Sequence, residues 1–424
     1  MTQFTIPEAE RDRIFNPWRT TANPQVDALC TTVASMLQDY EEHWQLRQRP
    51  RRQRDKEIMH ATVRSLVCDA LHRHLTTPDG EGRIMVSMSN AVRKSRYRHE
   101  IEGKQLPTIV SRLCSDGLRV LEIDELGEFV TRRMTAIKAG KFLRGVFRHY
   151  DFEQEDLILE PGQEIVILKQ AKERLNKDTA SDRSLWMEYR DTSTTRRYRA
   201  EVKRINENLI AADLEYRGGR LIDRTDRVLR RYFNNAKFDE GGRLFGGFWQ
   251  QLKSRQRRLI RIESEEVVTL DFDTMIARLA YAEMDLRLPA GDGYDIEGFT
   301  AGDRAGIKRL FSSMLFAQKP LKGWPRQVRE LFPEGTRLKD AVTAIQRAHP
   351  ELDPLWFSGT GHRLMFTESE IMVAVLLELL DNQVTALPIH DAIVVPAVLA
   401  DYASGVMLEK FEETTGQPAS VSSR

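Results

Sequence analysis

Two aspartates, Asp271 and Asp391, stand at the ends of apolar runs in the second half of the chain. The stretch VVTLDFDTMIARLAYAEMD, residues 267–285, begins as a buried strand and continues as a helix. TALPIHDAIVVP, residues 385–396, predicts a hairpin of apolar strands with His390 and Asp391 at its turn. Isolated buried carboxylates are costly, so such acids are usually paired, hydrogen-bonded or bound to a metal. With no basic partner nearby in the sequence, the two aspartates suggest a shared cation.

Oxygen ligands without a Cys or His cluster suit Mg²⁺, which takes one or two carboxylates and completes its shell with water and substrate phosphates. Two such ions about 4 Å apart stabilise the attacking and leaving oxygens of phosphoryl transfer. We therefore predict that Asp271 and Asp391 bind two Mg²⁺ ions, with Mn²⁺ as a substitute. A purely structural alternative has Asp271 capping the following helix and Asp391 making the turn.

The segment DRAGIKRLFSSMLFAQKP, residues 303–320, lies between the two acids. Helical spacing puts Arg304, Lys308 and Ser312 on one face, with Phe316 one turn further on. Two cations at one end of a helix suit a triphosphate, and the aromatic ring suits a base. The alternative is an amphipathic helix with solvated cationic edges.

A glycine-rich segment, FNNAKFDEGGRLFGGFWQQL at residues 233–252, precedes the first acid. Its two Gly-Gly pairs bracket Arg243, and glycines allow backbone to approach a ligand while an arginine reaches out to it.

These four motifs, in this order, resemble the palm and fingers of family A DNA polymerases and, more distantly, single-subunit phage-type RNA polymerases. The resemblance covers roughly residues 230–415. It implies an α+β fold in which a right-hand polymerase palm carries helical fingers and a reduced thumb.

The resemblance also implies residue roles. Asp271 and Asp391 would be the metal ligands, assisted by the backbone carbonyl of Phe272. Arg304 and Lys308 would bind the triphosphate, and Phe316 would lie beside the insertion site. Lys308 would also be the general acid for the pyrophosphate leaving group. On the nucleic-acid side, Arg243 resembles the arginine that holds the primer terminus, and Gln250, His390 and Arg278 are assigned to the same surface.

Four positions depart from the family pattern. Ala392 follows His390-Asp391 where family A enzymes usually have a glutamate, and Asp273 replaces a serine. Ile276 stands where DNA-making members have a glutamate that blocks the ribose 2′-OH, and Phe316 lacks a tyrosine hydroxyl. Sugar choice is therefore open, with deoxynucleotides favoured on steric grounds.

The first half predicts a mainly helical domain. Helices are expected at 24–46 and 55–75, and QLRQRPRRQR between them is either a solvated linker or a phosphate-contacting segment. A helix, turn and strand over 106–123, followed by a basic helix over 132–150, favour a winged helix that binds nucleic acid through Ser111 and Arg112. An undistinguished helical domain is the alternative.

This organisation predicts three parts. Residues 1–150 form the helical, winged-helix domain. Residues 151–232 hold a junction, with two short strands at 155–170, and a thumb-like charged helix at 182–216. Residues 233–424 form the palm and fingers, with the fingers at about 286–350. No room is left for an exonuclease domain.

Composition narrows the function. Lys and Arg number 64 against 63 Asp and Glu, so the net charge of +1 gives no global sign of a polyanionic partner. Three cysteines without CxxC spacing argue against a disulfide framework or zinc, and the absence of a long apolar run argues against a membrane and for a cytoplasmic protein.

We thus predict a template-directed nucleotidyltransferase, a minimal DNA polymerase acting on DNA template, primer and dNTPs. NTP use, primer-independent synthesis by a primase-polymerase, and the oligomeric state stay open. The arrangement suggests a plasmid, phage or other mobile element. Two alternatives are a DNA-binding replication initiator or regulator with a decayed palm, which Ala392 and Ile276 would permit, and a two-metal nuclease.

Overall fold

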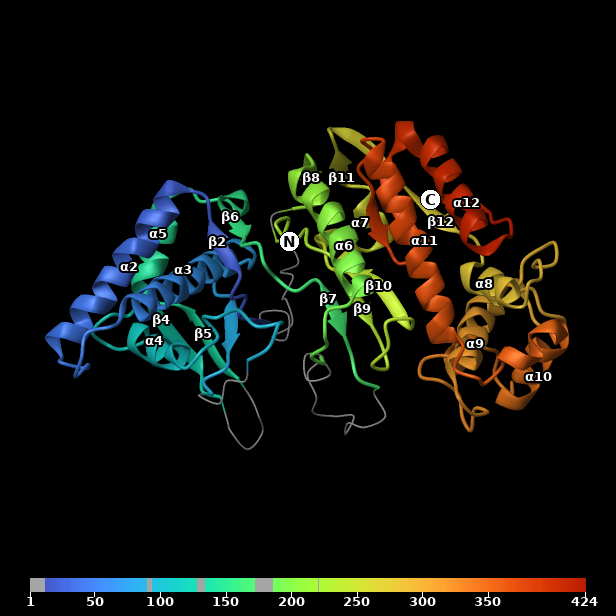
Figure 1. The fold of residues 1–424 in the computed structure, drawn as a ribbon, viewed down its shortest axis with the longest axis horizontal. Coiled ribbons are helices and arrows are strands. Elements are labelled where there is room, and N and C mark those ends of the chain that lie inside the picture. Colours follow the sequence, from blue (N-terminus) through green and yellow to red (C-terminus); the bar gives the residue numbers. More distant parts are fainter. Residues whose placement is uncertain (1–11, 90–93, 128–133, 172–185, 220) are drawn as a thin grey trace. The chain divides into compact units, whose positions relative to one another are not determined.

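The computed structural model describes residues 12–89, 94–127, 134–171, 186–219 and 221–424. The chain forms two compact units with a mixed α and β composition (Figure 1). The first unit comprises residues 1–164 and 219–226, and the second comprises residues 165–218 and 227–424.

The described part of the first unit contains four α-helices: α2 (Pro24–His43), α3 (Gln53–Leu75), α4 (Gln105–Leu113) and α5 (Lys141–His149). The side chain of Asn23 begins α2 by accepting hydrogen bonds from the backbone N–H groups of Gln25 and Val26, and Pro24 occupies the first turn. Helix α3 is the most deeply buried of these helices and packs against α2, α4 and α5. The helices predicted at 24–46 and 55–75 are therefore present.

The first unit also has a four-stranded sheet in the order β1-β3-β5-β4. Its strands are β1 (Asp12–Ile14), β3 (Arg83–Val86), β5 (Thr135–Ala139) and β4 (Leu121–Glu125), and only the β1–β3 pair is parallel. Strands β2 (Arg19–Thr21) and β6 (Leu157–Leu159) form a separate antiparallel pair. Strand β6 follows directly after the short helix η1 (Gln154–Asp156).

The basic helix predicted over 132–150 is wrong in its first half. Residues of β5 are buried on both sides of the sheet, and Gly140 then separates the strand from α5. A Cβ at Gly140 would lie 2.3 Å from the backbone oxygen of Arg119, so the strand end and the neighbouring turn approach too closely for any other residue.

The second unit centres on an antiparallel sheet. Its strands follow the order β13 (Leu387–Ile389), β14 (Ala392–Pro396), β12 (Glu265–Phe272), β11 (Ile260–Ile262) and β8 (Leu214–Tyr216). Strand β15 (Val421–Ser423) pairs with the end of β12 that β11 leaves open. A smaller sheet contains β10 (Gly241–Phe245), β9 (Arg230–Phe233) and β7 (Val166–Leu168).

Helices surround these sheets. They are α6 (Ser193–Ala211), α7 (Ser254–Arg257), α8 (Met275–Glu283), α9 (Arg304–Phe316), α10 (Leu338–Ala348), α11 (Gly361–Asp381) and α12 (Ala400–Thr415). Short 3-10 helices are η4 (Phe248–Gln251), η5 (Ala301–Asp303), η6 (Arg329–Leu331), η7 (Pro350–Leu355) and η8 (Ala397–Leu399). Helix α11 packs against β10, α12, α6 and α8 and so joins the two sheets (Figure 1).

The domain boundaries differ from those predicted. Both strands expected at 155–170 exist, as β6 and β7, but each pairs within a different unit, and the boundary falls after residue 164 instead of 150. Residues 151–232 do not form a part of their own. The charged helix expected at 182–216 begins at Ser193 as α6, and the predicted residues 182–185 lie outside the described part.

All three cysteines, Cys30, Cys68 and Cys114, are free thiols in this structure. Among the described residues, no helix combines the length and the apolarity that crossing a bilayer requires.

A buried charge cluster ties residues 219–226 to the first unit. Arg19 forms ion pairs with Asp69 at 3.1 Å and with Asp223 at 3.3 Å, and the Nε2 atom of His72 lies 2.8 Å from Asp223. Burial, with a further contribution from the charge of Arg19, lowers the pKa of His72 to about 4. His72 is therefore neutral in the folded protein at neutral pH.

This cluster predicts a pH-dependent stability. An unfolded His72 has a pKa of about 6.5, so the unfolded chain binds the extra proton first as the pH falls. The free energy of unfolding should drop by up to about 3 kcal/mol between about pH 6.5 and pH 4. Urea unfolding of the wild type and of His72→Gln, across that window, measures the effect. The substitution should flatten the pH profile, and parallel profiles would contradict the assignment.

Candidate active site

Strand pairing brings the two predicted acids together. Asp271 pairs with Ala392 in the antiparallel β12–β14 register, and the backbone N–H of Phe272 donates to the backbone oxygen of Asp391 at 3.3 Å. The hairpin of β13 and β14 turns tightly at His390, which adopts a left-handed backbone with φ of 56°. Asp271 and Asp391 therefore lie on neighbouring strands at one end of the sheet.

The two carboxylates repel each other. Burial raises the pKa of Asp271, and the negative charge of Asp391 raises it further. The charges of Arg424 and Lys308 act in the opposite direction. Arg424 follows β15 and places its Nη2 atom 3.0 Å from the Oδ2 atom of Asp271.

A cationic cavity of about 820 Å³ adjoins this acid pair. Its lining residues include five cations, Arg304, Lys308, Arg309, Arg326 and Arg424, together with Ser312 and Ser313. None of the described residues that line it is acidic. The predicted face of 303–320 is thus confirmed, since helix α9 presents Arg304, Lys308 and Ser312 to one cavity.

The cations are held in different ways. Arg304 pairs with Asp292, and its guanidinium carbon lies 5.4 Å from the centre of the Tyr294 ring. Arg309 donates to the backbone oxygen of Gln327 at 3.1 Å. Within the described part of the chain, neither the Lys308 side chain nor the Arg326 side chain has a hydrogen bond or ion pair. These two side chains are available to a ligand.

Arg243, in β10, lies near the second acid, Asp391. Its Nε and Nη2 atoms donate to the two carboxylate oxygens of Glu368 in α11, at 2.6 and 2.7 Å. Glu368 is 1% exposed, and burial raises its pKa. Arg243 and His390 line one small cavity, and the charge of Asp391 acts on Arg243. The pair therefore fixes Arg243 beside the His390-Asp391 turn.

His390 sits against the same strand. Its ring meets Phe245 edge-on, with centroids 5.3 Å apart. Burial, with the charge of Arg243, lowers the pKa of His390. A neutral imidazole beside Arg243 and Asp391 is the result.

Two side chains assigned to nucleic acid are engaged within the chain instead. The Gln250 amide donates to the backbone oxygens of Leu244 and Pro388, at 3.2 and 2.9 Å. Arg278 donates to the backbone oxygens of Asp273 and Pro418 and to the Ser420 hydroxyl. Both residues position the loops around the acids, because their donors are used there.

The remaining predicted site residues are the apolar ones: Phe272, Phe316 and Ile276. The Phe272 side chain is buried against Phe411, so only its backbone faces the acids. Phe316 ends α9 and meets His362 edge-on, with ring centroids 4.9 Å apart. A Cβ at Gly361 would lie 2.7 Å from the Phe316 ring, so this glycine makes room for it. Ile276 is half-buried in the first turn of α8.

The first unit matches only part of what was predicted for the winged helix. Helix α4 and strand β4 follow the predicted order of helix, turn and strand, and Ser111 is exposed on α4. Arg112, however, pairs with the buried Glu41 and donates to the backbone oxygen of Leu46 at 3.3 Å. The predicted nucleic-acid contact by Arg112 is therefore replaced by an internal one. The winged helix stays a prediction.

Sequence reasoning missed Arg326, Arg424 and Glu368. Glu368 had a usable signal, because it is an acid next to an apolar helical run, as Asp271 is beside an apolar strand. The sequence around Arg326 and Arg424 gave no such signal, because their positions depend on contacts with residues that are far away in the chain.

The acid pair fits magnesium. No group of three or more His, Cys, Asp or Glu side chains gathers into a metal site within the described ranges. Magnesium at phosphate sites usually needs only one or two carboxylates, and two repelling carboxylates beside a phosphate-sized cationic cavity meet that requirement.

Comparison with known proteins adds little to this geometry. No protein family matches the sequence, and no curated protein matches it. A solved structure described as the POL domain of Pol1 from M. smegmatis, in complex with DNA primer-template and dNTP, aligns with 54% of this chain. The identity is 12% and the TM-score 0.29, and the chain spans about half (50%) of that structure's length.

The Arg243–Glu368 pair generates a stability prediction. Glu368 is the buried partner, so Arg243→Ala leaves its charge buried alone and should lower the free energy of unfolding of the second unit by about 3–5 kcal/mol. The double variant Arg243→Ala/Glu368→Ala should recover part of this loss. Chemical denaturation of the four proteins in the double-mutant cycle measures the coupling. Additive losses would contradict a coupled pair.

Proposed function

We propose that this protein is a template-directed nucleotidyltransferase, a minimal family A-like DNA polymerase. One observation carries the proposal: the cavity lined by five cations adjoins the Asp271–Asp391 pair. Arg424 connects the two, because it lines the cavity and forms an ion pair with Asp271. A cationic cavity beside paired carboxylates suits a substrate that carries a triphosphate next to the reacting phosphorus. The resemblance of the four motifs to polymerases agrees with this reading.

The substrate would be a deoxynucleoside triphosphate. Arg304 and Lys308, one helical turn apart on α9, would bind its phosphates, with Arg326 nearby. Phe316, further along the same helix, would lie beside the base. Neither Ile276 nor Phe316 offers a hydrogen bond to a ribose 2′-OH, so selection against NTPs would rest on shape.

The reaction would join a primer to the nucleotide. The primer 3′-hydroxyl loses its proton to solvent water and its oxygen forms a bond to the α-phosphorus, while the bond from that phosphorus to the bridging oxygen of the β-phosphate breaks. Lys308 would give a proton to the departing pyrophosphate. Arg243, fixed by Glu368, would hold the primer terminus near Asp391.

Asp271 and Asp391, with the backbone of Phe272, would hold magnesium. When bound, magnesium supplies charge stabilisation to the attacking and leaving oxygens. The carboxylates alone cannot supply this, because they carry the same sign of charge as the phosphates.

The acids provide the first test of this function. Asp271→Asn and Asp391→Asn should each abolish templated primer extension with magnesium, while DNA affinity stays within about twofold of the wild type. Asp295→Asn is the matched control, because Asp295 is exposed and its side chain has no partner among described residues. Parallel reactions with dNTPs or NTPs, with and without a primer, report sugar choice and priming.

Three outcomes would overturn the assignment. Extension that survives in either variant would remove the acids from the chemistry. No extension by the wild type, with DNA binding intact, would favour an initiator or regulator with a decayed palm. Degradation of labelled DNA without added nucleotide would instead favour a nuclease.

Lys308 provides a separate test. Loss of a positioned general acid costs about 10²–10⁴-fold, so Lys308→Ala should lower kcat for extension by a factor in this range. Lys319→Ala, at an exposed position just beyond α9, should change kcat little. Single-turnover extension at saturating dNTP measures the step. Equal rates for the two variants would contradict the role of Lys308.

A further inference from the structure

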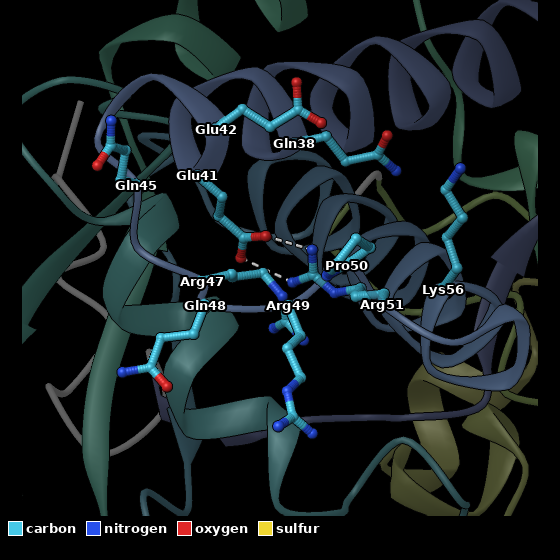
Figure 2. A pocket seen from close by; sticks show the side chains of 10 residues that line it. All are labelled: Gln38, Glu41, Glu42, Gln45, Arg47, Gln48, Arg49, Pro50, Arg51 and Lys56. Carbon is cyan, nitrogen blue, oxygen red and sulfur yellow. Dashed lines mark hydrogen bonds and ion pairs between the residues drawn. The ribbon is translucent and has the colours of Figure 1, made fainter.

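A second cationic cavity, of about 490 Å³, lies in the first unit where α2 and α3 are joined (Figure 2). Its lining residues are Gln38, Glu41, Glu42, Gln45, Arg47, Gln48, Arg49, Pro50, Arg51 and Lys56. We call residues 44–52 the basic loop. It contains the arginine-rich run that the sequence left open between a solvated linker and a phosphate-contacting segment.

A buried carboxylate holds this loop in place. Glu41 is 3% exposed, and it pairs with both Arg51 and Arg112 (Figure 2 shows the contact with Arg51). Arg112 also donates to the backbone oxygen of Leu46, whose own N–H donates to the backbone oxygen of Glu41. These contacts anchor the loop near both of its ends, at Leu46 and at Arg51. The loop is therefore held against the helices and is not a free linker.

The remaining cations of the loop have no partner. The side chains of Arg47, Arg49 and Arg52 are exposed and form no hydrogen bond or ion pair with the parts of the chain that the structure describes, and the same holds for the side chain of Lys56 on α3. Like charges held close together repel, which a flexible linker would relieve by spreading. A fixed loop that keeps them near one cavity is preorganised for an anion.

Polar and aromatic groups surround these charges. The side-chain amides of Gln38, Gln45 and Gln48 line the cavity and can donate and accept hydrogen bonds. Trp44, which precedes Gln45, is 61% exposed. Its indole meets His43 edge-on at 5.1 Å, so one large ring is held at the surface where the basic loop begins.

We propose that the basic loop and its cavity bind single-stranded DNA, with backbone phosphates on Arg47, Arg49 and Lys56 and an unpaired base on Trp44. Arginine and lysine contacts alone would suit any nucleic-acid backbone. An exposed indole beside them favours a single strand, because only unpaired bases present a face for stacking. A concave cavity of this size, within the range of about 300–1,000 Å³ typical of small-ligand sites, also suits one nucleotide better than a duplex.

This binding site is separate from the proposed polymerase chemistry. It is built from residues of the first unit, whereas the acids and the triphosphate cavity belong to the second. Its test therefore measures DNA binding and not nucleotide incorporation. The Asp391→Asn protein should bind through the basic loop as the wild type does.

The test uses the full chain and fluorescence anisotropy with a labelled oligo-dT of about 20 nucleotides, titrated at several salt concentrations. Arg47→Ala/Arg49→Ala should weaken binding about tenfold or more and reduce the slope of log affinity against log salt by about 1.4, which is about 0.7 for each lost phosphate contact. Arg98→Ala/Arg148→Ala removes the same charge from exposed positions of the same unit and should leave the slope unchanged.

Trp44 separates single-strand from duplex binding. Trp44→Ala should weaken oligo-dT binding about tenfold, Trp44→Phe should retain most of it, and binding of a blunt duplex should not respond to either change. Equal effects of the loop and control variants would overturn the proposal. A loss that is the same for oligo-dT and duplex, without any effect of Trp44→Ala, would also overturn it and would indicate a site for duplex phosphates.

Discussion

The pairing of β12 with β14 is the constraint on which the second unit depends. Its register sets Asp271 opposite Ala392 and so brings Asp271 next to Asp391, although the two are far apart in sequence. Two like charges at a half-buried sheet end are unfavourable by themselves. The surrounding structure compensates with positive charge from several directions: α9 supplies Lys308, the segment after β15 supplies Arg424, and Arg243 lies beside the hairpin turn.

Local segregation of charge, and not total charge, defines this chain's surfaces. A net charge of +1 conceals two cavities whose free cations outnumber their free acids, one in each unit. Both cavities are built in the same way. An acid within the chain holds one arginine in place, Asp292 for Arg304 and Glu41 for Arg51, while neighbouring cations stay without partners in the described structure. Holding one cation fixed keeps its neighbours oriented toward the cavity.

The sequence predicted what depends on local spacing. Helical periodicity placed Arg304, Lys308 and Ser312 on one face, and the change from strand to helix located Asp271. It failed where the result depends on long-range contacts. Nothing near Arg424 in sequence indicates that β15 would pair with β12, and the periodicity of α4 shows that Arg112 is helical without showing that Glu41 covers it. The return of residues 219–226 to the first unit, anchored by Asp223, is equally invisible to local pattern.

The buried and half-buried acids of the described chain differ in their partners, and the difference supports the proposed site. Most are satisfied by arginine within the chain, as Asp69 is by Arg19 and Glu368 by Arg243. Asp271 instead faces another carboxylate, and Arg424, its one ion-pair partner among the described residues, has a side chain that is 65% exposed. An exposed arginine can leave this contact at little cost, since surface ion pairs contribute about 0–1 kcal/mol. A structural acid needs a partner that stays, whereas an acid that binds a metal and a phosphate substrate needs one that can be displaced. Arg424 meets the second requirement, because it also lines the cavity into which the phosphates would enter.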